Sequence, residues 1–325
     1  LQAITEDPSN NDAKLILLFF NLLDFAIDPY NLNLATPPSG KILNFMWVKT
    51  LLLLIVSVAF SAIRVPEDYA TIQGAINSVS QGDTILVSSG TYYGNIEINN
   101  DDFEDLIDNA DIDLTIISTN GADETILDGN GNGPVLSIVG EDFDVEISGF
   151  TIQNGVNEKG GGIFIDGPFF TIYDLVVRNN QAYKYGGGIY CYQGESPVDD
   201  RFTQFDNLII EENHIYTPWT GNSGGLGGGL YSDVKNGLTL TNSIFQYNST
   251  SNRAAVYMRQ KVYIENVDII HNQAGALCGL LLYNASNSYI KDVNISHNII
   301  SEYEYDGWGA RATGIMFFYS SNMIV

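Results

Sequence analysis

The amino-acid sequence predicts an all-β protein, a right-handed parallel β-helix with a short capping helix near its N-terminal side. Three observations predict this fold: a repeat of about 26 residues, apolar positions alternating with polar ones between repeated bends, and a turn-rich composition. The chain has 325 residues, including 32 Gly and 19 Tyr, and only 16% of them are charged. Such a composition is typical of many short strands rather than of long helices.

The repeat consists of an Asx residue, five further residues and an Asn. It occurs in five segments: Asp174 to Asn180, Asn207 to Asn213, Asn242 to Asn248, Asn266 to Asn272, and Asp292 to Asn298. A sixth segment has Gly149 and Gly155 at the two positions. Asn, Asp and Gly share a tolerance of left-handed backbone angles, so we expect a bend at both positions. Asn side chains stacked at the bends should hydrogen-bond along the axis as a ladder.

Two strand registers alternate with these bends. The first has apolar inward positions, which are Phe150 and Ile152, Leu175 and Val177, Leu208 and Ile210, Val267 and Ile269, and Val293 and Ile295. The second follows each Asn, often after three glycines, at Ile163-Phe164, Ile189-Tyr190, Leu230-Tyr231, Val256-Tyr257, Leu282-Tyr283 and Ile315-Met316. Spacings of 41, 26 and 26 residues separate Ile189, Leu230, Val256 and Leu282, which predicts coils of about 26 residues with loop insertions.

A helical cap is predicted at the start of the coils. The stretch from Val65 to Ile76 places Ile72, Ala75, Ile76 and Val79 on one helical face, and Gly82-Asp83 ends it. A strand from Thr84 to Val87 and a turn over Ser89-Gly90-Thr91-Tyr92 should follow. A helix placed here would cover an open β edge.

These residues resemble the start of bacterial secreted pectin-lyase-like β-helix proteins, with their Pro-x-x-Tyr-x-Thr-Ile-Gln-x-Ala-Ile cap and Gly-Asp-Thr-Ile-x-Val-x-x-Gly-Thr-Tyr strand. The resemblance extends from about Ile63 to Val325. It implies the fold rather than one activity, because that superfamily holds lyases, hydrolases, epimerases and adhesins. The Gly-Gly-Gly-Ile-Tyr pattern is similar to the repeats of polymorphic outer-membrane proteins and autotransporter passengers, which implies an adhesin-like role.

The N-terminal 61 residues are expected to lie outside the mature fold. Met46, Lys49, the apolar run from Leu51 to Phe60 and the small residues around Ser61 have the order of a signal peptide over residues 46–61, with cleavage after Ser61. Residues 1–45 are then upstream read-through or an unstructured extension, and residues 62–325 form the β-helix. Because Tyr319 to Val325 resembles the approach to another strand, we expect the β-helix to be truncated at Val325.

Charge and cysteine content restrict the possible partners. A formal net charge of -25 opposes binding to nucleic acid, and the mature chain has no segment predicted to insert into a membrane. The two cysteines, Cys191 and Cys278, are expected to lie about three coils, or roughly 14 Å, apart, which is too far for a disulfide. We therefore expect buried free thiols.

Three segments are longer than the basic coil and should protrude as loops, namely 192–204 on one edge and 214–226 and 299–312 on a common edge. They carry aromatic and acidic residues, of which we expect these to bind a ligand: Tyr192, Glu195, Tyr216, Trp219, Tyr303, Tyr305, Asp306 and Trp308. Aromatic rings can stack on apolar sugar faces while carboxylates accept hydroxyl hydrogen bonds. The alternative is a set of variable surface loops whose aromatic residues cover the coil beneath.

Catalytic residues are less evident. Pectate-lyase-like chemistry needs calcium held by carboxylates and an arginine near the sugar, and only Asp199, Asp200 and Arg201 form a cluster of the needed types. They are adjacent in a loop rather than stacked across coils, so they are weak candidates. The polygalacturonase motifs are absent apart from Asp-Asp pairs.

Metal sites are possible but not predicted. His271 and His297 should stack one coil apart, following Glu212 and Tyr247 in one column, but no third zinc ligand is evident. The acidic run from Asp101 to Asp113 could bind calcium through oxygen ligands, although a solvated insertion explains it better. We therefore expect no cofactor, with calcium as the alternative.

Taken with the export signal, these features predict a secreted or cell-surface β-helix that binds an extracellular polysaccharide or a cell-surface glycan through its edge loops. The alternative is a polysaccharide lyase or glycoside hydrolase of the pectin-lyase-like superfamily that uses the same surface. The residues favour the binding protein without excluding the enzyme.

Overall fold

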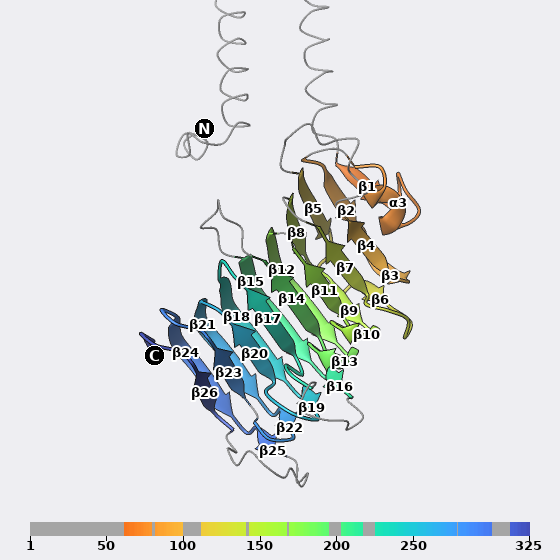
Figure 1. Cartoon of the computed structure of the whole chain (residues 1–325). Coiled ribbons are helices and arrows are strands. Elements are labelled where there is room, and N and C mark those ends of the chain that lie inside the picture. Colours follow the sequence, from red (N-terminus) through yellow and green to blue (C-terminus); the bar gives the residue numbers. More distant parts are fainter. Residues whose placement is uncertain are drawn as a thin grey trace, which may run out of the picture. The chain divides into compact units, whose positions relative to one another are not determined.

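The computed structural model describes residues 62–79, 82–99, 112–140, 143–167, 169–194, 203–216, 225–277, 279–300 and 313–325. Residues Ser61–Val325 form one compact unit. Its strands lie side by side in successive coils, from β1 and α3 at one end to β24 and β26 at the other (Figure 1). The predicted right-handed parallel β-helix is confirmed.

Three parallel sheets form the walls of the coils in the described ranges. The largest, sheet A, has twelve strands: β1 (Ile63–Val65), β2 (Thr84–Val87), β3 (Gly90–Tyr93), β5 (Ile112–Ser118), β6 (Thr125–Asp128), β8 (Phe143–Ser148), β9 (Thr151–Gln153), β12 (Phe169–Arg178), β15 (Thr203–Glu211), β18 (Leu238–Gln246), β21 (Val262–Ile270) and β24 (Tyr289–Ser296). Sheet B has eight: β4 (Ile96–Asn99), β7 (Leu136–Val139), β11 (Ile163–Asp166), β14 (Ile189–Gln193), β17 (Leu230–Val234), β20 (Val256–Arg259), β23 (Leu280–Tyr283) and β26 (Ile315–Phe318). Sheet C has six: β10 (Val156–Lys159), β13 (Gln181–Tyr185), β16 (His214–Ile215), β19 (Ser249–Thr250), β22 (Gln273–Ala274) and β25 (Ile299–Ile300).

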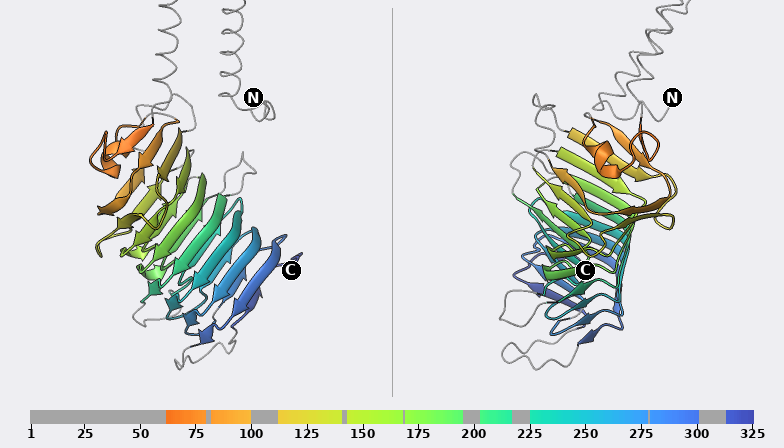
Figure 2. Two further views of the ribbon diagram at one scale, coloured as in Figure 1. Left: turned by 180° about the vertical axis from the view of Figure 1, so that it is seen from behind. Right: turned by 90° about the vertical axis from the view of Figure 1, so that its right-hand side faces the viewer.

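The core is a continuous apolar column inside the coils. Each strand contributes alternate residues to it, as in β12, where Leu175 and Val177 are buried while Val176 faces outward. Phe150, Phe205 and Phe245 are among its largest fully buried side chains. Figure 2 shows the strands of successive coils from two further sides. Such a packed core gives the outer surface a rigid support.

The first predicted bend is confirmed, and the second needs a correction. Asp174, Asn207, Asn242, Asn266 and Asp292 all have positive φ between 51° and 56°, as the repeat predicts. At the second position the left-handed residue is instead the one before the repeated Asn, or before Gly155 in the sixth segment. These left-handed residues are Asn154, Asn179, Glu212, Tyr247, His271 and His297.

The Asn residues of the second position form the predicted ladder, and it is buried. The side chain of Asn213 accepts from the backbone N–H and the side-chain Nδ2 of Asn180, at 3.1 and 3.0 Å. Its own Nδ2 donates to Val177 O at 2.9 Å and to Asn248 Oδ1 at 3.0 Å. Asn272 and Asn298 continue the same pattern. These positions require an amide because it is both donor and acceptor along the axis.

The strand register differs from the predicted one at β23. Val256 pairs with Leu280, 24 positions later, and not with Leu282, which pairs with Met258. The coil from Asn248 to Asn272 is likewise 24 residues long. Tyr257 therefore aligns with Leu281 instead of Tyr283, because the inward-outward alternation fixes the pairing.

The N-terminal cap is shorter than a full amphipathic helix but buries the predicted face. The helix α3 (Ile72–Ile76) begins after Thr71, whose side chain accepts from Gly74 N–H, and ends at Asn77. Ile72, Ala75 and Ile76 are buried. The predicted turn at residues 89–92 is wrong from its second residue onward, because Gly90–Tyr93 forms β3 and pairs with β6. Among the described residues there is no helix whose length and apolar content would suffice to span a bilayer.

Candidate functional site

Two of the predicted ligand-binding residues, Tyr192 and Tyr216, fall within the described ranges, and both are exposed. Tyr192 is 36% exposed and Tyr216 is 57% exposed. The other ligand-binding candidates lie outside the described residues, namely Glu195, Trp219, Tyr303, Tyr305, Asp306 and Trp308. The same holds for the catalytic candidates Asp199, Asp200 and Arg201, for Cys278, and for the acidic run over 101–111.

Tyr192 projects from the outer face of sheet B near the strand ends. It pairs in register with Asp166 of β11 and Asp233 of β17. Tyr192 therefore lies between two aspartates, one in the coil before it and one in the coil after it. Asp233 is largely buried and accepts from Arg259 Nη1 at 2.6 Å and from Gln260 Nε2 at 2.9 Å. The Arg259 guanidinium also lies 5.1 Å from the centre of the Tyr283 ring. This part of the edge is therefore held in place by its own polar contacts.

Cys191, next to Tyr192, points into the core. It is a free, fully buried cysteine whose thiol lies 3.7 Å from Tyr231 O. Burial, together with the nearby Asp233 carboxylate, raises the pKa of the Cys191 thiol well above its ordinary value. A protonated thiol of this kind is not a nucleophile, and the expected buried free thiol is confirmed at this position.

Tyr216 directly follows β16, at the side of sheet C where its strands end. The rings of His214 and Tyr216 are 6.4 Å apart, and His214 Nδ1 lies 2.5 Å from Ser249 Oγ in the next coil. Desolvation lowers the pKa of His214, which favours its neutral form. The segment 301–312 follows β25, which belongs to the same sheet as β16. The described starting points of the two tryptophan-bearing segments thus share one edge, as predicted.

The predicted histidine column is present. The rings of His271 and His297 stack with centroids 4.9 Å apart, and Tyr247 stacks on His271 at 5.4 Å. Among the described residues there is no cluster of three or more His, Cys, Asp or Glu side chains arranged to hold a metal ion. Two imidazoles and a phenol ring in face-to-face contact form a polar surface column.

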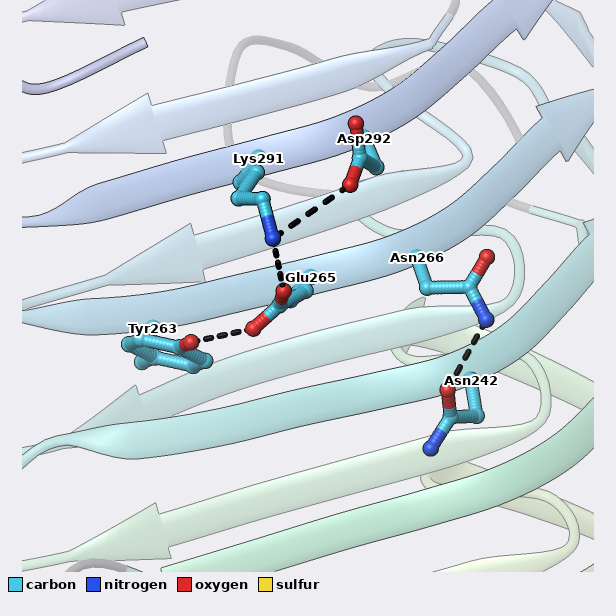
Figure 3. A network of polar contacts seen from close by, with 6 residues as sticks. All are labelled: Asn242, Tyr263, Glu265, Asn266, Lys291 and Asp292. Carbon is cyan, nitrogen blue, oxygen red and sulfur yellow. Dashed lines mark hydrogen bonds and ion pairs between the residues drawn. The ribbon is translucent and has the colours of Figure 1, made fainter.

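The outer face of sheet A is polar. Over its C-terminal strands β18, β21 and β24, the polar side chains bind one another. Lys291 Nζ lies 2.5 Å from Glu265 and 3.5 Å from Asp292, and Tyr263 donates to Glu265 (Figure 3). The hydrogen bond and charge of Lys291 lower the pKa of Glu265. Asn266 donates to Asn242 at 2.8 Å beside this network. The polar groups in this region are already paired along the axis.

An open depression of about 560 Å³ lies further toward the N-terminal side of the same face. Its walls are the segment 120–123 on one side and residues of β12 and β15 around Tyr173 and Asn207 on the other. Sequence reasoning placed Asp174 and Asn207 at a bend but did not connect them with Tyr173 or Asp123. The available signal was the pair of small residues Ser148 and Gly149 in the coil beneath Tyr173.

Comparisons with known proteins give one short family match. A model of the Chlamydia polymorphic membrane protein repeat matches residues 174–192. No curated protein matches the chain. The crystal structure of Escherichia coli ybhc matches 80% of this chain and 70% of its own at 10% identity, with a TM-score of 0.29. The matched repeat starts at the bend residue Asp174, includes β13 and the glycine turn, and ends at Tyr192 in β14.

Proposed function

We propose that this chain is an exported, surface-exposed β-helix that binds glycans in the manner of an adhesin. The observation that supports it best is the exposure of Tyr192 and Tyr216 near the ends of strands in a rigidly packed solenoid. Tyr192 precedes a segment with the acidic residues Glu195, Asp199 and Asp200, and Tyr216 precedes a segment with Trp219. Rings held at fixed positions can stack on sugar faces with little loss of conformational entropy.

Surface exposure is supported by the match of residues 174–192 to the repeat of Chlamydia polymorphic membrane proteins. We further propose that residues 46–61 act as a signal peptide. Sequencing the N-terminus of the protein isolated from its source cells should then give Ala62 as the first residue. A mature chain that retains residues 46–61 would contradict export by cleavage.

Glycan binding is tested by applying the full chain to an array of extracellular and cell-surface glycans. We expect saturable binding that falls in the variants Tyr192→Ala and Tyr216→Ala. The variant Tyr247→Ala, which removes an exposed tyrosine from the histidine column, is the matched control and should bind normally. Wild-type protein that binds no glycan would contradict the proposal.

The alternative activity is cleavage of a polysaccharide, and the same samples test it. A lyase would release unsaturated chain ends and a hydrolase would release reducing ends. Product that forms with wild-type protein and is lost in Asp200→Ala would favour the enzyme over the binding protein. Binding without product is the expected result.

A further inference from the structure

The depression on the outer face of sheet A differs from the surface around it. Further along the same face, aromatic rings pair with each other, as Tyr263 does with Tyr289 at 4.8 Å. In the depression, Tyr173 aligns with Ser148 on one side and with Asp206 on the other. No ring in the described part of the chain stacks on Tyr173, so an aromatic side chain lines an open space.

Small residues create that space. In the coil beneath Tyr173 and Asp174, the corresponding positions are Ser148 and Gly149, and Gly149 has a φ of 81°. A side chain at Gly149 would start 3.0 Å from Ser118 Cβ, so the coil there is already in close contact with the one below. Neither Ser148 nor Gly149 therefore has a side chain large enough to fill the depression.

The opposite wall is fixed before any ligand binds. The Ser118 hydroxyl accepts from the backbone N–H groups of Asn120 and Gly121, at 3.1 and 3.0 Å. Thr151 Oγ1 donates to Ala122 O at 2.7 Å, which ties the segment to β9. A wall held by such contacts loses little entropy when a ligand binds.

Polar groups surround the opening on both sides. Asn207 Nδ2 donates to Asp174 Oδ1 at 2.5 Å, and both side chains are exposed. Asp123 lies on the opposite wall and is exposed as well. Apolar surface from Val176 and Ile209 completes the lining. The volume of about 560 Å³ falls in the range of small-molecule sites, roughly 300–1,000 Å³.

The Tyr173 hydroxyl is directed by its neighbours. It donates to Glu146 Oε1 at 2.7 Å. A hydrogen bond from Ser148 lowers the pKa of Tyr173, but the bond to Glu146, burial and the nearby carboxylates outweigh it and raise the pKa. The phenol therefore stays protonated at neutral pH and its ring is held in one orientation.

We propose that this depression binds one sugar residue of a neutral glycan, with the Tyr173 ring as its apolar platform and Asp123, Asp174 and Asn207 as hydrogen-bonding partners. An aromatic ring beside carboxylate and amide groups matches a sugar, which has an apolar face and a rim of hydroxyl groups. The described lining contains Asp123 and Asp174 but neither Lys nor Arg. Uronic acids and sulfated sugars would be repelled, the more so because the whole chain carries a net charge of -25.

This proposal deepens the proposed function, on which it rests, and it adds a site separate from the edge loops. Its test is a calorimetric titration of the full chain with neutral hexose and N-acetylhexosamine oligosaccharides, and with uronate and sulfated oligosaccharides of equal length. We expect wild-type binding to the neutral set only. Tyr173→Ala should weaken it by about tenfold or more, and Tyr173→Phe, which keeps the ring, by no more than about threefold.

Two further variants make the result specific. Tyr263→Ala removes a tyrosine from the same sheet face outside the depression, so its affinity should equal that of wild type. Asn207→Gly keeps the left-handed backbone angle of 51° but removes the rim amide, and should weaken binding even if Tyr173→Ala folds poorly. Folding of each variant is checked by thermal unfolding.

The outcomes separate the two proposals. Wild-type binding that is unchanged in Tyr173→Ala and Asn207→Gly but lost in Tyr192→Ala or Tyr216→Ala would overturn this site and leave the proposed function standing. A preference for acidic oligosaccharides would overturn the ligand class. Absence of wild-type binding to any glycan would overturn both.

Discussion

Single side chains hold adjacent coils of this solenoid together at buried positions. The Asn ladder is the clearest case, since Asn180, Asn213, Asn248 and Asn272 are each about 1% exposed or less. In Asn213, Asn248 and Asn272 the side-chain oxygen accepts from the Asn of the preceding coil, and the side-chain Nδ2 donates to a backbone carbonyl of the preceding coil and to the Asn of the next coil. A buried amide that lost its partners would leave polar groups unsatisfied, which is costly because water cannot replace them.

Replacing Asn213 by alanine should therefore destabilise the fold strongly. The backbone N–H and side chain of Asn180 and the side chain of Asn248 each lose a partner, and we expect a loss of about 3 kcal/mol in the free energy of unfolding. Denaturant unfolding measures it. The control is Asn294→Ala, which removes an exposed amide that donates to Asp268 and should change stability by less than about 0.5 kcal/mol. Equal losses in the two variants would show that the ladder does not stabilise the coils.

Asp128 gives a prediction about pH. Its burial would raise its pKa, but hydrogen bonds from Gln153, Asn130 N–H and Asn154 outweigh burial and lower the pKa below its ordinary value of 3.8. A carboxyl group with a lower pKa in the folded state binds its proton more readily when unfolded. Its stabilising contribution is thus complete well above pH 3.8 and is lost as the pH falls through the folded-state pKa.

The measurement is the difference in melting temperature between wild type and Asp128→Asn from pH 3 to pH 7. We expect wild type to be more stable at pH 7 and the difference to shrink as the pH falls below about 4. The Asp268→Asn variant, at a half-buried outward strand position, serves as control and should follow wild type. A difference that grows toward low pH would contradict the hydrogen-bond account of Asp128.

At the scale of elements, the glycine turns before sheet B set how closely the coils approach. Gly161 has no left-handed backbone angle, yet a Cβ atom there would lie 2.3 Å from Gln181 O in the next coil. The glycine is required by the close approach of two backbones rather than by φ. Three consecutive glycines occur before β11, β14 and β17: the first of each triplet has a left-handed φ of 60° to 72°, and the second and third approach neighbouring coils closely.

Gly161→Ala should push the two coils apart and destabilise the protein by about 2 kcal/mol or more, because the clashing atoms belong to backbone that cannot rotate away. Gly194→Ala is the matched control, since nothing lies within 4 Å of its Cβ position. Thermal unfolding of both variants tests this. If Gly161→Ala were as stable as Gly194→Ala, the close coil contact would be absent.

The elements also show what the sequence could and could not predict. Bends at Asp174 and Asn207 were predictable because their residue types favour the left-handed region. The second bend was misassigned, since Glu212 and Tyr247 adopt the left-handed region although their residue types rarely do, and the adjacent Asn is needed inside for the ladder. The strand pairing in the structure, and not the 26-residue spacing in the sequence, shows that Leu280 is in register with Val256.

At the scale of the whole molecule, the surface is built from columns that cross many coils. The sequence predicts the exposure of Tyr216, which directly follows β16, but it places Tyr192 in a protruding loop, whereas Tyr192 lies within β14 and is exposed because it faces outward from the strand. The depression at Tyr173 depends on which residues lie above one another when coils differ in length. Ser148 and Gly149 lie 25 positions before Tyr173 and Asp174, whereas Asp206 lies 33 positions after Tyr173. Because these spacings differ, the alignment of the residues across coils could not be predicted from the sequence.

We propose that this acidic solenoid binds neutral glycans on its outer surface. The most direct test of this proposal is a crystal structure of the full chain with a neutral oligosaccharide that binds it in solution. We predict an intact oligosaccharide with one sugar ring against Tyr173 and its hydroxyl groups within hydrogen-bonding distance of Asp174 and Asn207. A cleaved oligosaccharide would contradict glycan binding without catalysis. An empty depression with the sugar bound at Tyr192 or Tyr216 would contradict the Tyr173 site and leave glycan binding by the edge loops standing.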